Sequence, residues 1–263
     1  MNRIENLFNK KRKSGKSALI FYLTAGYPDL MTTEALLPAL EKAGADMVEL
    51  GVPFSDPIAD GPVIQKASSD ALEKGATVKK ILSIVHRFRK KSEMPIVLFG
   101  AFNPFYKFGL EKLVKECARI GADGLLVPDL PPEEAEELIS FCDDAGLCHI
   151  FLASPTTSPE RSRLIVEKST GFIYYISTRG VTGARDKLDK SILAQVKKIK
   201  SLTEKPVAVG FGISKPEHVA WLRGKADGII VGSALIKEIG KGASVEERVQ
   251  LASQFTRKLA LML

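Results

Sequence analysis

The chain has 263 residues, of which 45% are hydrophobic and 26% charged, and it carries a formal net charge of +7. These proportions are typical of a globular domain, so they exclude disordered and collagen-like chains and provide enough apolar surface for a sizeable core. We expect no nucleic-acid partner, because the basic residues are scattered apart from Lys10–Lys16 and His86–Lys91, two clusters better explained as solvated surface. A mildly basic protein also suits an anionic substrate.

The N-terminal segment, MNRIENLFNKKRKSGKS, is an amphipathic stretch followed by a basic cluster. It predicts a short helix and not a secretory signal, because neither an apolar region nor a small-residue cleavage site follows it. No later segment has an uninterrupted apolar run of about 18 residues, the minimum for a helix that crosses a bilayer. We therefore expect a cytoplasmic protein with no membrane partner.

The rest of the chain alternates short apolar, β-branched runs with amphipathic segments, a pattern typical of a parallel sheet covered by helices. The predicted strands are Ala18–Thr24, Met47–Gly51, Ile96–Gly100, Gly124–Val127, His149–Leu152, Phe172–Ser177, Val207–Gly210 and Gly228–Val231. The clearest helices, with apolar residues at spacings of three and four, are Thr33–Ala43, Leu110–Ile120, Glu133–Ala145 and Lys190–Ser201.

Glycine closes several of these helices just before a strand, in AGAD (43–46), IGAD (120–123) and DAG (144–146), as expected at a helix C-cap. Eight βα units without a Pro/Gly/Ser-rich linker favour one closed barrel over an open, doubly wound sheet. The sequence therefore predicts a single-domain (β/α)8 TIM barrel over residues 1–263. In such a barrel, catalytic residues lie on the loops at the carboxyl ends of the strands.

The second predicted strand carries a candidate catalytic acid, Glu49. If Val48 and Leu50 face the helices, alternation points Glu49 into the barrel. An unpaired buried carboxylate is costly, so its pKa should be raised and it should exchange protons near neutral pH. A Glu buried in a salt bridge is the structural alternative.

The loop after this strand, PFSDPIADGP (53–62), adds two more acids, Asp56 and Asp60, among three prolines that restrict its backbone. Chemistry alone does not distinguish the two, and either could make an Asx-type turn. No third ligand cluster supports a magnesium site here. Cys117, Cys142 and Cys148 are odd in number and lack CxxC pairing, so we expect reduced, mostly buried thiols and no bound metal.

Glycine-bearing turns follow the last three predicted strands, at residues 180–183, 210–214 and 232–234. In barrels of this kind, glycines after strands seven and eight commonly let backbone N–H groups approach a phosphate. Glycines that only close tight corners are the alternative.

These segments resemble the tryptophan synthase alpha chain family. The resemblance is most specific in VELGVPFSDPIADGP (48–62), and it extends over nearly the whole chain. The other matching segments are SxxGVTG (177–183), GFGIS (210–214), GSA (232–234), YLTAGYP (22–28), NPF (103–105) and VPDLPPEE (127–134). It implies that Glu49 is the general acid/base, that Asp60 contacts the indole nitrogen, and that Asp56 supports the loop and an interface.

The resemblance also implies the substrate-binding residues. It assigns the phosphate to backbone N–H groups at Gly183, Gly212, Gly232 and Ser233. It places Thr182 in a loop that closes over the substrate. It assigns substrate contacts near the indole to Tyr22, Tyr174 and Phe211, for which ordinary barrel packing is the alternative.

The reaction implied is the retro-aldol cleavage of indole-3-glycerol phosphate to indole and glyceraldehyde 3-phosphate, a step of L-tryptophan biosynthesis. Glu49 would serve both proton transfers and ionised Asp60 would stabilise charge at the ring nitrogen. The resemblance implies no cofactor in this chain. It implies a beta chain partner that uses pyridoxal phosphate, in an αββα heterotetramer through which indole passes in a tunnel.

Two segments depart from the family pattern. FGAFN (99–103) has Gly100 and Ala101 where the family commonly has methionine and tyrosine, which predicts a looser indole pocket or slower turnover. The family more commonly has arginine directly after the serine, whereas in this chain Thr178 stands between Ser177 and Arg179. These departures motivate an alternative, a catalytically weak subunit that mainly activates the beta chain. A sugar-phosphate isomerase or epimerase is a third hypothesis, which the Glu49–Asp60 loop disfavours.

Overall fold

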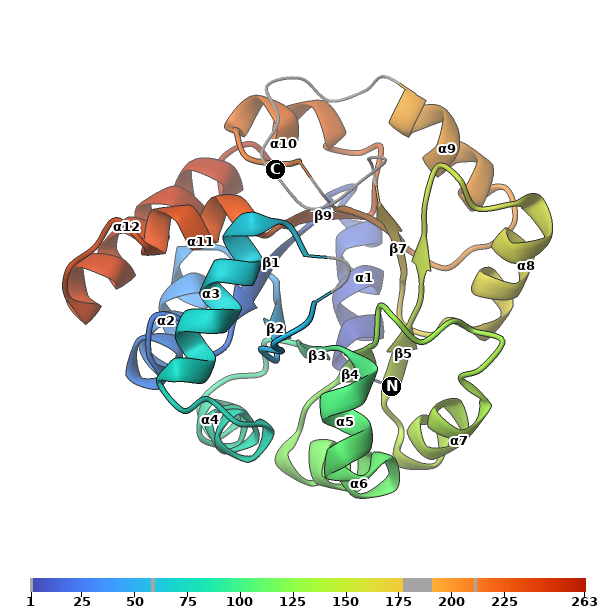
Figure 1. Ribbon diagram of the computed structural model, residues 1–263. Coiled ribbons are helices and arrows are strands. Elements are labelled where there is room, and N and C mark those ends of the chain that lie inside the picture. Colours follow the sequence, from blue (N-terminus) through green and yellow to red (C-terminus); the bar gives the residue numbers. More distant parts are fainter. Residues whose placement is uncertain (1, 58–59, 177–190, 211) are drawn as a thin grey trace.

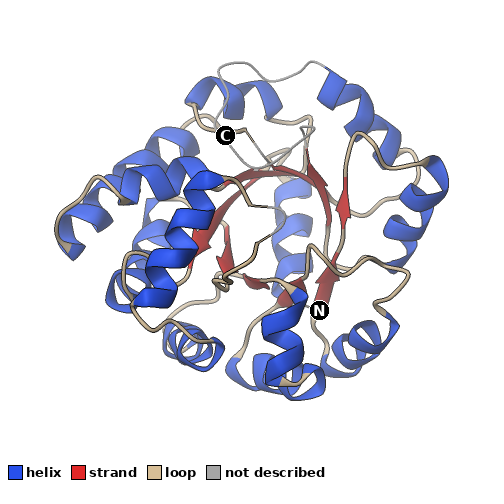
Figure 2. Cartoon of the chain, in the orientation of Figure 1, coloured by secondary structure: helices blue, strands red, loops and turns tan. Residues whose placement is uncertain are grey.

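A ring of parallel strands surrounded by helices forms the computed structural model (Figure 2), which describes residues 2–57, 60–176, 191–210 and 212–263. The strands are β1 Ala18–Thr24, β2 Met47–Gly51, β3 Ile96–Phe99, β4 Gly124–Leu126, β5 Cys148–Ile150, β6 Leu152–Ala153, β7 Ile173–Ile176, β8 Val207–Gly210 and β9 Gly228–Val231. The helices are α1 Arg3–Lys13, α2 Leu30–Ala43, α3 Pro62–Glu73, α4 Val78–Arg89, α5 Phe102–Phe108, α6 Leu110–Ile120, α7 Glu136–Ala145, α8 Pro159–Lys168, α9 Ser191–Lys200, α10 Pro216–Leu222, α11 Ser233–Ile239 and α12 Val245–Ala260.

The strands are paired in the order β5-β4-β3-β2-β1-β9-β8-β7-β6. Only Phe151 separates β5 from β6 along the chain, so the chain itself joins the two ends of this ladder. The N–H of Tyr174 on β7 donates to the carbonyl of Phe151 over 3.1 Å, which carries the pairing across the junction. The predicted (β/α)8 barrel is therefore confirmed, with one correction: the predicted strand His149–Leu152 is two short strands, one paired to each neighbour.

Two predicted helices begin at other residues than expected. α2 begins at Leu30, before the predicted Thr33, because the Asp29 side chain caps it by accepting from the N–H of Thr32 over 2.7 Å. α7 begins at Glu136, after the predicted Glu133, because the chain first makes a turn in which the N–H of Glu134 donates to the Pro131 carbonyl.

Each strand divides its side chains between the helices and the barrel interior. On β2, Val48 and Leu50 pack in the large outer cluster with the helices, whereas Met47 belongs to the smaller cluster inside the barrel. Alternation along a strand then directs Glu49 to the interior, as predicted. The acid side chain is therefore placed by the same pattern that builds the core.

Helix α1 closes the amino-terminal end of the barrel. Its Ile4 and Phe8 are buried in the interior cluster, and the Phe8 ring lies 5.5 Å from that of Phe172, centre to centre. The side-chain amide of Asn2, its N-cap, donates to the carbonyls of Asp123 and Gly146 over 2.8 and 3.0 Å. Figure 1 shows α1 behind the ring of strands. Access to the interior is thus confined to the carboxyl ends of the strands.

Asp123, just before β4, fixes this closed end through a buried ion cluster. Its carboxylate accepts from Arg89 over 2.8 Å, from Arg3 over 3.1 Å and from the N–H of Ile96 over 2.8 Å. The Asp123 side chain is 1% exposed and that of Arg89 is 9% exposed, so water cannot replace a lost partner. The cluster ties α1, α4 and the start of β3 together.

We predict that Arg89→Met lowers the free energy of unfolding by about 3 kcal/mol, because it leaves a buried carboxylate without its closest cation. Urea denaturation at neutral pH measures the change. Arg119→Met is the matched control, since water replaces the partner in the exposed Arg119–Glu116 pair and its loss should change the stability little. Equal losses in the two variants would contradict the role given to the buried cluster.

Two further observations concern membrane-spanning helices and the cysteines. Across the described ranges, no helix has both the length and the apolar character needed to cross a membrane. All three cysteines are buried free thiols, as predicted, and burial raises the pKa of Cys142 and Cys148 to about 12.

Candidate active site

Glu49 is the central residue of β2 and is completely buried inside the barrel. Neither carboxyl oxygen has a hydrogen-bond partner among the described residues. Burial raises the pKa of Glu49 to about 8, because the apolar surroundings disfavour the charged form. The carboxyl group is therefore mainly neutral at neutral pH, so it can donate a proton and then accept one.

Two tyrosines share the interior with Glu49. Tyr22 on β1 is its direct partner in the strand register, and Tyr174 comes from β7. Both side chains are buried, and burial, with smaller contributions from Asp60 and Glu49, raises the pKa of each phenol above its usual range. Both phenols are therefore neutral over the physiological range.

Each tyrosine lies against a glycine on the next strand. A Cβ atom added at Gly51 would lie 2.3 Å from the Tyr22 hydroxyl, and one added at Gly210 would lie 2.2 Å from the Tyr174 hydroxyl. Any larger residue would therefore displace the ring. Sequence reasoning missed the role of Gly51, although a glycine two residues after an inward-facing acid was a signal for it.

Asp60 follows β2 in the loop before α3 and is half-buried. It lines a small cavity with Tyr22, Phe99 and Ala101, among others. Burial raises the pKa of Asp60 to about 6, and its backbone carbonyl accepts from the Gln65 side chain over 2.8 Å. Asp60 is therefore mainly ionised at neutral pH, unlike Glu49.

Asp56 occupies a different surface. Its side chain is exposed, accepts from the Ser55 hydroxyl over 2.5 Å, and lines an outer hollow with Phe54 and Gln65. It does not line the cavity of Asp60. The structure thus separates the two loop acids that chemistry alone could not distinguish.

Two of the predicted glycine turns lie among the described residues, one after β8 and one after β9, the strand that pairs with β1. Gly212 has a φ of +76°, in the left-handed region that favours glycine. Gly232 lies next to Tyr22, since an added Cβ would be 3.4 Å from the Tyr22 Cβ. Ser233 is the first residue of α11, where backbone N–H groups have no acceptor within the helix. The predicted site residues Thr182, Gly183 and Phe211 lie outside the described residues.

Gly100 and Ala101 both line the cavity beside Asp60. An added Cβ at Gly100 would lie 2.7 Å from the Phe105 ring and 3.1 Å from Val52, so neighbouring side chains pack closely around this glycine. The looser indole pocket expected from these two small residues stays a prediction.

We predict that Glu49→Gln raises the thermal midpoint by several degrees near pH 8, with the gain shrinking toward pH 5. Because the pKa of Glu49 in the fold is about 8, above its ordinary 4.5, the folded chain keeps a proton that the unfolded chain releases, and stability falls as pH rises between these values. Calorimetry of both proteins at several pH values measures the difference. A gap that is independent of pH would contradict the raised pKa.

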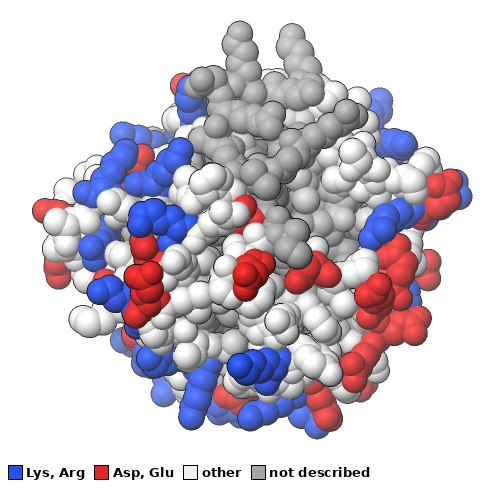
Figure 3. Space-filling model, viewed as in Figure 1, with Lys and Arg blue, Asp and Glu red and all other residues white. Residues whose placement is uncertain are grey.

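The fold and these side chains together define a class of protein. A (β/α)8 barrel with a neutral buried carboxyl and an ionised carboxylate at the carboxyl ends of its strands is a general acid–base enzyme. Figure 3 shows this face with Lys and Arg mainly around its rim and several acidic side chains near its middle.

Comparisons with known proteins narrow this class. The sequence profile described as tryptophan synthase alpha chain matches residues 8–261. The chain is 47% identical over 253 residues to the tryptophan synthase alpha chain of Geotalea daltonii, with 96% of each chain covered. It is 44% identical over 259 residues to that of a Thermoanaerobacter species, with 98% of each covered.

Solved structures agree. A chain of Mycobacterium tuberculosis tryptophan synthase matches with a TM-score of 0.92 and 35% identity, over 99% of this chain and 98% of that one. Tryptophan synthase subunit alpha from Legionella pneumophila matches with a TM-score of 0.91 and 37% identity, over 100% and 98%.

The chain belongs to the tryptophan synthase alpha chain family. It is a lyase of tryptophan biosynthesis, and the reaction of this subunit is the cleavage of indole-3-glycerol phosphate. Membership does not favour the alternative of a catalytically weak, mainly activating subunit. It also gives no support to a sugar-phosphate isomerase or epimerase.

Proposed function

We propose that Glu49 and Asp60 together perform the cleavage of indole-3-glycerol phosphate. The observation that carries this proposal is the difference between their pKa values, about 8 for Glu49 and about 6 for Asp60. Between these values Glu49 holds a proton and Asp60 carries a charge. Two carboxyl groups whose environments separate their pKa values can take distinct acid and base roles.

The cleavage proceeds in two proton transfers. Glu49 donates its proton to C3 of the indole ring, which leaves a positive charge centred on the ring nitrogen. Asp60 accepts a hydrogen bond from that N–H and stabilises the charge. The Glu49 carboxylate then removes the proton of the hydroxyl on the carbon attached to C3. As the carbonyl forms, the C–C bond breaks and its electron pair returns to the ring. Glu49 ends protonated, as it began.

The remaining predicted residues hold the substrate. Tyr22 and Tyr174 flank the indole beside Glu49, and the phosphate binds across the barrel mouth through backbone N–H groups at Gly212, Gly232 and Ser233. Gly183, Thr182 and Phe211 complete this set by family resemblance. The support for this placement is that Gly232 lies next to Tyr22, so one ligand can reach both ends of the site.

We predict a bell-shaped pH profile of kcat/KM with limbs near pH 6 and pH 8. The rate rises as Asp60 ionises and falls as Glu49 loses its proton. Indole release from indole-3-glycerol phosphate measures it. Glu49→Gln should lower kcat by about a thousandfold.

Asp60→Asn is the matched control for the acidic limb, because the substrate phosphate also titrates near pH 6. The variant should lose this limb if Asp60 causes it and keep the limb if the phosphate does. A Glu49→Gln protein that retains most of its activity would contradict the mechanism.

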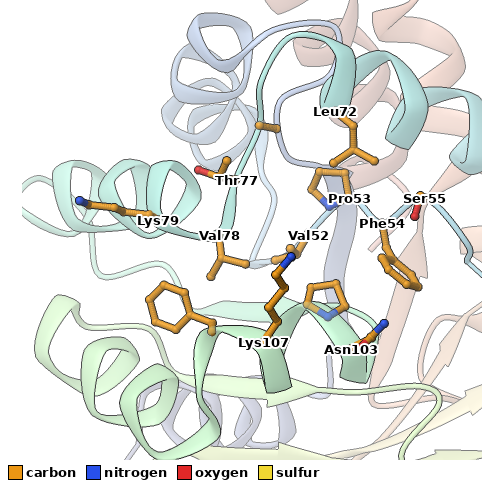
Figure 4. Close-up of a pocket in the computed structure, with 13 residues that line it drawn as sticks. Val52, Pro53, Phe54, Ser55, Leu72, Thr77, Val78, Lys79, Asn103 and Lys107 are labelled. Carbon is orange, nitrogen blue, oxygen red and sulfur yellow. The ribbon is translucent and has the colours of Figure 1, made fainter.

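We also propose that the chain binds a tryptophan synthase beta chain in an αββα heterotetramer. This chain itself needs no cofactor, because pyridoxal phosphate is bound by the beta chain, and the assembly works in the cytoplasm. The support is an apolar hollow of about 540 Å³ outside the barrel mouth. Figure 4 shows its wall: Phe54 from the loop after β2, Val78 from the start of α4, and Asn103 and Lys107 from α5.

The hollow adjoins the catalytic cavity. Val52 and Phe54 line both, so a wall of these side chains separates the two spaces. A beta chain seated on the hollow would lie close to where indole is released, as transfer through a tunnel requires.

We predict that Val78→Asp weakens binding of the beta chain at least tenfold, because it places a charge in an apolar contact. Isothermal calorimetry with the beta chain measures the affinity. Leu261→Asp is the control, since Leu261 is 79% exposed and follows α12, outside the hollow. Unchanged affinity in Val78→Asp would place the interface elsewhere.

A further inference from the structure

The Tyr22 ring occupies the space where a side chain at residue 51 would stand. An added Cβ at Gly51 would lie 2.3, 2.5 and 2.7 Å from the hydroxyl, Cζ and Cε2 atoms of Tyr22. Contacts this short involve the ring itself and not only a flexible end. Even alanine at residue 51 therefore excludes the observed position of the ring.

This position lies nearer the open end of the barrel than Glu49, by one inward-facing residue of β2. Glu49 and Gly51 are successive inward-facing residues of β2, about 7 Å apart along the strand, and Gly51 is nearer the open end. Tyr22 is paired in register with Glu49, yet its hydroxyl reaches the level of Gly51. The ring therefore slants from the level of Glu49 toward the barrel mouth.

Phe99 holds the ring from the next strand. It is paired in register with Gly51, and its ring meets that of Tyr22 edge to face, with centroids 5.3 Å apart and an interplanar angle of 81°. Tyr22 is 7% exposed and Glu49 is fully buried. Gly51 and Phe99 thus form a seat for the Tyr22 ring on the mouth side of Glu49.

We propose that Gly51 is a positioning residue for the lyase reaction: by lacking a side chain, it seats the Tyr22 ring over Glu49, and the seated ring keeps water from the carboxyl group. This inference rests on the role proposed above for Glu49. It adds that Gly51 acts through Tyr22, without touching the substrate.

Few charged groups compete with the exclusion of water in setting the pKa of Glu49. Among the described residues, the titratable groups that act electrostatically at this end of the barrel are Tyr22, Tyr174 and Asp60. The neighbouring strand β3 presents Val97 and Phe99, which are apolar. Burial is the cause that raises the pKa of Glu49, so access of water to Glu49 should control its titration.

A double-mutant cycle on kcat/KM tests the inference, with Gly51→Ala, Tyr22→Leu and the double variant. Gly51→Ala displaces the ring and Tyr22→Leu removes it, so each should move the high-pH limb down by about one pH unit or more. The double variant should show no further shift, because both changes remove the same cover. Additive shifts, or an unmoved limb in Tyr22→Leu, would overturn the proposal. Tyr22→Leu keeps the test valid if Gly51→Ala does not fold.

Two controls separate positioning from general damage. Tyr22→Phe keeps the ring and should leave the high-pH limb unmoved, whereas a shift as large as that of Tyr22→Leu would show that the hydroxyl acts instead. Leu23→Val lies on the outer face of the same strand, so it should lower the thermal midpoint without moving the limb. A shifted limb in Leu23→Val would make the effect nonspecific and overturn the proposal.

A second readout does not depend on activity. Uncovering Glu49 should flatten the fall in thermal midpoint between about pH 5 and pH 8, with Glu49→Gln as the reference without this titration. A flattened profile in an active protein supports the inference. An active Glu49→Gln protein would instead refute the proposed function, and an unflattened profile in Gly51→Ala and Tyr22→Leu would refute the inference alone.

Discussion

The chemistry of this site depends on one constraint, the burial of an unpaired carboxyl group inside the barrel. If Glu49 were ionised, it would face apolar and phenolic side chains, and none of the described residues is placed to donate a hydrogen bond to it. An isolated charge is costly in such a place, so the group keeps its proton instead. The barrel thereby holds at neutral pH the proton that carbon–carbon cleavage needs. Asp60, nearer to water, keeps its charge.

The architecture separates stability from chemistry at the two ends of the barrel. At the amino-terminal end, α1 and the Asp123 ion cluster close the interior, and the Asp123 carboxylate there is paired. At the carboxyl-terminal end, the strands present Glu49 and the tyrosines with fewer compensating contacts. The stabilising contacts at the closed end offset the free-energy cost of the unpaired buried acid toward the other end.

The succession of eight βα units was sufficient to predict the barrel, and alternation along β2 was sufficient to predict the inward direction of Glu49. Family resemblance, not spacing, singled out Asp60. The features that the sequence did not predict depend on contacts between residues that are distant along the chain. The break at Phe151 is bridged by Tyr174 of a later strand, and the space at Gly100 is filled from α5. A local sequence pattern does not indicate which distant residues will be in contact.

The most direct test of the account is the titration of Glu49 itself. Carbon-13 NMR of the substrate-free protein labelled at glutamate carboxyl groups, with the Glu49 signal assigned from its loss in Glu49→Gln, measures the pKa without any assumption about the reaction. We predict a midpoint near 8. A midpoint close to the ordinary glutamate value of 4.5 would show a carboxylate that is charged at neutral pH, and it would contradict the role of Glu49 as proton donor.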